Sequence, residues 1–257
     1  MSAMLDHLVT QLFSLHVRLL ACRERLAANT DSEALHDLRT STRRLRSLIR
    51  PLREVPAVAQ LEEAARALGR LTTPLRDREV LAAHLSAHGQ SLPGQPSPTE
   101  QEQTFAKVAD SDELKRLLTV LDAAPALLRV ARRDKLLPKP GAQVEKRLRK
   151  QWRKLREALE DPAHDRHRLR LLIKRVRYGD EAFPQLDHAG KKLRALLKRA
   201  QGDLGDWHDR LQWLLQAERE QALTPYAERW QRELHRFEGK ADATLEQLSA
   251  ALVRRRH

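Results

Sequence analysis

The chain contains two sets of histidine, arginine and lysine residues at the same helical spacing, here called the basic stripes. The sets are His36, Arg39, Arg43 and Arg46, and His167, Arg170, Lys174 and Arg177. In both, successive members lie three, four and three positions apart, which places them on one face of an α-helix, one turn above another. Because stacked like charges weaken a helix, the pattern predicts that an anion lies along each stripe.

The first stripe borders the face of its helix that we expect to be buried. Each basic residue follows an apolar position by one residue, about 100° around the helix, as Arg39 follows Leu38 and Arg46 follows Leu45. The cations therefore lie along a groove or a bundle edge, where a lower dielectric strengthens the hold on an anion. Arg50 extends the stripe, and from Arg39 to Arg50 it covers roughly 16 Å of helix. That length suits an extended chain of phosphates better than one small phosphate.

Composition also indicates a polyanionic partner. The 257 residues include 48 Lys and Arg against 35 Asp and Glu, a net charge of +13, and the pI is near 10.4. Nucleic acid, an acidic membrane surface and a phosphate polymer all fit this charge. The aromatic content of 4% argues against single-strand binding by base stacking. Lone Cys22 predicts a reducing compartment, the cytoplasm, and the lack of a long apolar run predicts no membrane insertion.

Helical periodicity dominates and predicts an all-α fold. Two segments rich in proline and glycine interrupt it, at 89–98 and 136–141. We expect helices near 4–27, 33–53, 56–72, 74–88, 142–160, 165–183, 186–203, 206–222 and 225–253, with a broken helical segment at 99–134. Asp31 or Ser32 is expected to cap the second helix, and Asp206 to cap the helix that follows a turn at Asp203. Pro74 and Pro225 suit first-turn positions.

The two halves of the chain, 1–135 and 142–257, repeat the same order of expected helices. Because the offset between matching positions stays near 131, we interpret this as an internal duplication. The predicted architecture is a single domain of two pseudo-symmetric four-helix-bundle halves. If these halves pack about a two-fold axis, the basic stripes converge on a central basic groove or pore.

Motifs of catalysis are missing from the sequence. It has no glycine-rich phosphate loop, nucleophile elbow or zinc-protease helix, so we predict a protein that is not an enzyme. His36 and His167 have three alternative roles, as structural side chains, as additional phosphate donors or as metal ligands together with Asp209. We predict no metal site and no cofactor, because the histidines and the single cysteine lack metal-ligand spacing.

The residues around both stripes resemble the CHAD family, the conserved-histidine α-helical domains. The resemblance rests on HDLRTSTRRLR at 36–46 and HRLRLLIKRVRYGDE at 167–181, followed by RDREV at 76–80 and LGDWHD at 204–209. It implies an all-helical domain with a central basic pore that binds inorganic polyphosphate, often in association with polyphosphate granules. The implied ligands are His36, Arg39, Arg43, Arg46, His167, Arg170, Lys174, Arg177, Lys198 and His208. The Tyr-x-x-Glu of 178–181 has no counterpart in the first half, so the two ends of the groove are expected to differ.

We therefore predict non-enzymatic binding of inorganic polyphosphate by both stripes, with Arg50 among the ligands. Two alternatives stay open. A nucleic-acid-binding helical protein would need an element that enters a groove or aromatic residues for stacking, and we expect nucleic acid to bind at most non-specifically. A metal-dependent phosphohydrolase would use His36, His167 and Asp209.

Overall fold

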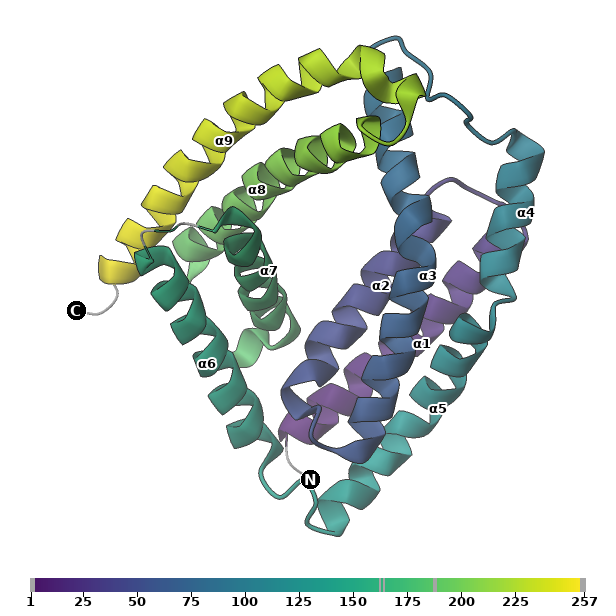
Figure 1. The fold of residues 1–257 in the computed structure, drawn as a ribbon. Coiled ribbons are helices and arrows are strands. Elements are labelled where there is room, and N and C mark those ends of the chain that lie inside the picture. The colour runs from purple at the N-terminus through teal and green to yellow at the C-terminus, as the bar shows by residue number, and fades with distance from the viewer. Residues whose placement is uncertain (1–2, 162, 164, 187–188, 255–257) are drawn as a thin grey trace. The chain divides into compact units, whose positions relative to one another are not determined.

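A computed structural model describes residues 3–161, 163, 165–186 and 189–254. All regular secondary structure within these ranges is helical (Figure 1), which confirms the predicted all-α class. The α-helices are α1 (Ala3–Ala27), α2 (Ala34–Ile49), α3 (Pro56–Ser86), α4 (Pro98–Ala109), α5 (Asp112–Arg133), α6 (Pro140–Glu160), α7 (Arg166–Ala182), α8 (Lys191–Ala217) and α9 (Thr224–Val253). Short 3-10 helices are η1 (Arg50–Leu52), η2 (Pro184–Leu186) and η3 (Gln221–Leu223). None of the described helices is both long and apolar enough to cross a bilayer.

The chain forms two compact units, Met1–Glu145 and Lys146–His257. In unit 1, α1 packs on α2, α4 and α5, and α3 packs on α2 and α5. The core between these helices is rich in leucine, with Leu19, Leu38 and Leu117 all fully buried. The predicted duplication and central groove concern the relation between the two units and stay predictions.

Unit 2 is built around α8, which packs along α9 and against α7 (Figure 1). Its core joins side chains from all of its α-helices, among them Trp152 of α6, Ile173 of α7, Leu204 of α8 and Leu245 of α9. Gly179 allows α6 to approach α7 closely, because a Cβ added there would lie 2.8 Å from Leu148 Cδ2. A side chain at this position would therefore require the Leu148 side chain to shift.

The two helices that carry the basic stripes bury the apolar rows expected from the sequence. In α2 and η1 these residues are Leu35, Leu38, Leu45, Ile49 and Leu52, and in α7 and the residue after it they are Leu169, Ile173, Val176 and Phe183. Burying one such side chain contributes about 1.5–3 kcal/mol. The rotation of each helix about its axis is thereby set, and the basic stripe lies beside its buried row.

The expected break between helices 56–72 and 74–88 is wrong. α3 continues from Pro56 to Ser86 with Pro74 inside it. Proline in a helix interior removes a backbone hydrogen bond and costs about 3 kcal/mol. Both parts of α3 bury residues in the core, including Leu61 and Leu68 before the proline and Leu81 and Leu85 after it. This shared burial keeps the two parts in one helix despite Pro74.

The expected turn at Asp203 and the N-cap at Asp206 are also wrong, because α8 is continuous from Lys191 to Ala217. Asp203 is buried in the middle of this helix. Its carboxylate accepts a hydrogen bond of 2.7 Å from Thr244 Oγ1 and lies 3.1 Å from Lys240 Nζ, both on α9. A buried carboxylate needs such partners, and here they come from the neighbouring helix. Positions 187 and 188 of the expected helix 186–203 lie outside the described residues.

Other expected helix ends agree or need small corrections. The broken segment 99–134 is α4 and α5, and Pro225 lies in the first turn of α9, as expected. α2 ends at Ile49, so Arg50 belongs to η1 and not to the stripe helix. Pro51 has no N–H to continue the α-helical hydrogen bonds. Neither Asp31 nor Ser32 is the cap of α2; that position is Glu33, without a side-chain cap.

Candidate anion-binding site

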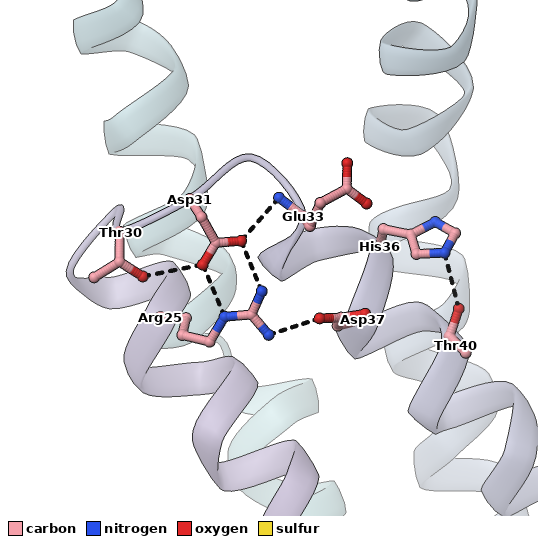
Figure 2. A network of polar contacts seen from close by, with 7 residues as sticks. All are labelled: Arg25, Thr30, Asp31, Glu33, His36, Asp37 and Thr40. Carbon is pink, nitrogen blue, oxygen red and sulfur yellow. Dashed lines mark hydrogen bonds and ion pairs between the residues drawn. The ribbon is translucent and has the colours of Figure 1, made fainter.

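The first basic stripe begins beside an ion-pair network that joins α1 to α2 (Figure 2). Arg25 Nη2 and Nε donate to the two carboxylate oxygens of Asp31 at 2.6 and 2.8 Å, and Arg25 Nη1 donates to Asp37 Oδ2 at 2.7 Å. The hydrogen bond from Arg25 lowers the pKa of Asp31 to about 2. His36 points away from this network, and its Nε2 lies 3.4 Å from Thr40 Oγ1. The network therefore positions the turn of α2 at which the stripe begins.

Arg39 forms hydrogen bonds with residues of α3. Its Nη1 donates to Thr72 Oγ1 at 2.9 Å and Thr73 Oγ1 at 3.2 Å, and lies 3.4 Å from the carbonyl oxygen of Gly69. Burial lowers the pKa of Arg39, and the positive charges of Arg43 and Arg76 act in the same direction. Arg39 remains protonated, because arginine titrates far above neutral pH. The site thus holds a desolvated cation beside other cations, and the carboxylate of Asp77 opposes the decrease in pKa.

Further along α2, Arg43 is half-buried and donates from Nη2 to Thr40 Oγ1 at 3.2 Å. Arg46 and Arg50 follow at the C-terminal end of the stripe, where both approach the buried Glu62 of α3. Arg66, one turn beyond Glu62 on α3, approaches the same carboxylate. Packing of α2 and η1 on α3 therefore brings Arg39, Arg46 and Arg50 into contact with α3, and Arg66 joins Arg46 and Arg50 at Glu62.

In unit 2 the second stripe ends at a network around Arg177. Arg177 Nε donates to Gln201 Oε1 of α8 at 2.7 Å, and its Nη1 donates to Glu181 Oε1 at 2.6 Å. Its guanidinium carbon also lies 4.5 Å from the centre of the Tyr178 ring, a cation–π distance. Tyr178 in turn accepts a hydrogen bond of 3.1 Å from Gln201. Arg177 is thus held in one position, with part of its charge compensated by Glu181.

The start of the second stripe contacts His208 of α8. The rings of His167 and His208 have centroids 5.5 Å apart. Burial, together with the positive charges of Arg170, His167 and Lys174, lowers the pKa of His208 to about 4. The Nδ1 atom of His208 is buried and has no hydrogen-bond partner among the described residues. The free protein therefore holds a neutral histidine in a cationic environment.

The remaining predicted ligand, Lys198, is exposed on α8. It lies between Arg194 and Gln201, which both hydrogen-bond residues of α7. Arg194 Nε donates to Asp180 Oδ2 at 2.6 Å, and Asp180 is buried. Here α7 supplies the buried acid and α8 the base, whereas in unit 1 the buried acid is Glu62 of α3. Within the described part of the chain, no three His, Cys, Asp or Glu side chains are grouped as metal ligands would be.

Comparison with known proteins identifies the family. A family model described as the CHAD domain matches residues 11–218. The chain belongs to the CHAD family. It is also similar in structure to the crystal structure of the CHAD domain from the plant Ricinus communis, with 22% sequence identity and a TM-score of 0.65 over 98% of this chain and 92% of that chain. At this identity the likeness shows a shared fold. A comparison with curated protein sequences finds no match.

Sequence reasoning missed several residues at the sites of this CHAD domain. Arg66 and Glu62 were not predicted because they lie on α3, outside the repeated motif. Gln201, which orients Arg177, is an uncharged residue that no charge pattern selects. Asp180 was visible in the motif of the second half, but its ion pair with Arg194 depends on how α7 and α8 pack. Helical spacing back from His208 to Gln201 and Arg194, seven residues at each step, was a usable signal.

Proposed function

We propose that this CHAD domain binds inorganic polyphosphate and has no enzymatic activity of its own. The observation that carries the proposal is the row of half-buried arginine and lysine side chains on α2 and on α7, each next to a helix, α3 or α8, that carries further basic residues. Arginine contacts phosphoryl oxygens with two donors where geometry allows, and lysine and histidine add single donors. The proposed ligands are the basic stripes together with Arg50, Arg66, Lys198 and His208.

The proposal also includes an internal duplication of the chain and a location in the cytoplasm. The repeated stripes, each on a helix that packs against the next long helix, support an internal duplication of four-helix halves. Cys22 is a free, buried thiol, which supports action in the reducing cytoplasm. Binding to long polyphosphate chains would bring the protein to polyphosphate granules.

Selectivity tests the proposal directly. We expect long-chain polyphosphate to bind at least about a hundredfold more tightly than orthophosphate, since a single phosphate satisfies few of the cations. Calorimetric titrations with long-chain polyphosphate, orthophosphate and duplex DNA at one salt concentration measure this. Equal affinity for DNA and polyphosphate would indicate a general nucleic-acid or polyanion surface. Release of phosphate from the polyphosphate in the presence of divalent metal would instead indicate a phosphohydrolase.

A pH dependence of binding is expected from His208. In the free protein its pKa is about 4, so it stays neutral from pH 7 to pH 5. A bound polyanion favours the protonated form and raises this pKa, so binding takes up a proton. Affinity should therefore increase as pH falls from about 7 to 5. Titrations across this range at fixed ionic strength measure the slope.

The His208→Gln variant is expected to lose part of that slope, because glutamine does not titrate. His235→Gln is the matched control, since His235 is an exposed histidine of the same unit. Protonation of the polyphosphate chain ends affects all three proteins equally and cancels in the comparison. If His208→Gln keeps the full slope, His208 is not coupled to the ligand.

A further inference from the structure

The helix α6 carries a basic surface that neither stripe includes. Seven of the eleven residues from 146 to 156 are lysine or arginine, and none of the eleven is acidic. The five exposed basic residues among them lie on one side of the helix, because they are spaced three and four positions apart. This surface, which belongs to unit 2, is here called the α6 basic face and consists of Lys146, Arg149, Lys150, Arg153 and Lys154.

The α6 basic face points directly away from the core of unit 2. The opposite side of α6 supplies the buried side chains Leu148, Trp152 and Leu155, and Leu148 lies against Gly179 of α7. At about 100° per residue, the centres of the buried row and of the basic face are about 180° apart around the helix. The stripes differ from this arrangement, because each borders a buried row and its arginine and lysine side chains are half-buried. The α6 basic face is therefore a separate surface.

Acidic side chains compensate the charge of this face only in part. No ion pair joins Lys146, Lys150 or Lys154 to another described residue, and Arg153 lies 3.5 Å from Glu157. Like charges three and four residues apart repel one another and weaken a helix. The buried row of α6 keeps the helix formed in spite of this repulsion, and an anion lying along the face would relieve it.

The exposure of these side chains decides which anions the face can hold. A single exposed ion pair contributes little, because water and salt screen it, so a small anion is held poorly. A polymer of phosphates contacts several of the cations at once, and each contact releases counterions. From Lys146 to Lys154 the face extends about 12 Å along the helix. It includes no apolar side chain that could enter a bilayer and no aromatic side chain that could stack on bases.

We propose that the α6 basic face binds a second polyphosphate chain, so that one molecule joins the chain held by the stripes to a neighbouring chain. This inference rests on the proposed function of the stripes and adds a role in cross-linking chains. When the stripes hold the protein on one chain, other chains nearby are at a high effective concentration at α6. Weak exposed contacts are then sufficient to hold the second chain.

A capture assay with two chains tests this proposal. Long-chain polyphosphate is immobilised, protein is bound to it, and a fluorescent short polyphosphate of one defined length is then added. The amount of bound protein and the label captured per bound protein are measured separately at fixed salt. The proteins are the wild type, the variant Lys150→Ala with Lys154→Ala, and the control Lys192→Ala with Arg219→Ala. Lys192 and Arg219 are exposed residues of unit 2 outside α6, so the control removes the same net charge.

We expect the α6 variant to bind the immobilised chain within about threefold of the wild type, because exposed charges contribute little individually. It should capture the labelled chain at least about tenfold less, since two contacts of the second site are lost. The control should capture the label as the wild type does. The melting temperature of the α6 variant should not fall, because alanine favours a helix and two repelling charges are removed. Loss of capture is thereby separated from unfolding.

Equal capture of the label by the α6 variant and the wild type would refute the inference, because another surface would then join the chains. Wild-type protein that binds the immobilised chain without capturing label would also refute it and would leave the proposed function intact. Failure of the wild type to bind the immobilised chain would refute the proposed function itself. Capture of labelled duplex DNA as strong as that of the labelled polyphosphate would overturn polyphosphate as the partner of this face.

Discussion

Replacing Arg43 and Lys174 together by alanine is expected to weaken polyphosphate binding about a hundredfold or more. Each residue is half-buried near the middle of its stripe, Arg43 on α2 and Lys174 on α7. A charge-assisted contact contributes about 1.5–3 kcal/mol, so each single variant should lose about tenfold or more in affinity. Calorimetry with long-chain polyphosphate at fixed salt measures all three variants.

Folding should be little affected by these substitutions. Neither side chain belongs to the apolar rows that hold α2 and α7 in the core, and changes outside the core usually alter stability by about 0.5 kcal/mol or less. The melting temperature of the double variant should therefore remain close to that of the wild type. Unfolding of Arg43→Ala would instead identify Arg43 as part of a structural ion pair.

The matched control replaces the neighbouring residues, Arg44 and Arg175, by alanine. Both are exposed and lie one position further along the same helices, about 100° around from the stripe. This pair removes the same net charge from the same two helices. If it weakens binding as much as Arg43→Ala with Lys174→Ala, binding depends on total charge and not on the stripes.

Raising salt from about 50 to 200 mM should lower affinity for long-chain polyphosphate by about a thousandfold or more. For nucleic acids, each neutralised phosphate adds about 0.9 to the slope of log K against log salt, and six to ten contacts give about 10³–10⁵ over this range. The stripes and their neighbours supply a similar number of cations. Binding measured by fluorescence anisotropy across a salt series gives the slope.

The double variant with Arg43→Ala and Lys174→Ala tests whether this slope depends on the basic stripes. Loss of Arg43 and Lys174 should reduce its magnitude by about two, one for each contact removed, whereas loss of Arg44 and Arg175 should leave it nearly unchanged. A wild-type slope close to zero would contradict the electrostatic mechanism. An equal reduction in both double variants would show that the whole basic surface contributes.

Most of the local architecture was predictable from the sequence. The all-α class, the burial of Leu38 and Ile173 with their rows, and the helical placement of both stripes follow from periodicity over ten to twenty residues. Such periodicity reports directly which face of a helix is buried. The CHAD family was recognised from the same segments, since both motifs are continuous in sequence.

The sequence predicted helix ends near Pro74 and Asp203, but both helices continue there, because packing in the core outweighs the local tendency of these residues to interrupt a helix. Proline and aspartate both favour a break, yet α3 and α8 each bury residues on both sides of these positions. The partners that stabilise Asp203 lie on α9, about 40 residues away along the chain. A prediction based on neighbouring residues does not include them.

The sequence by itself determined the helices, the buried rows and the two basic stripes, because each depends on residues within a few turns of one another. Only the tertiary structure decided which basic side chains lie close to one another and which of them are desolvated. The convergence of Arg46 and Arg66 on Glu62, and the low pKa of His208 beside His167, both require two helices to be in contact. Charge interactions and desolvation depend on distance and burial in three dimensions, and a linear sequence specifies neither.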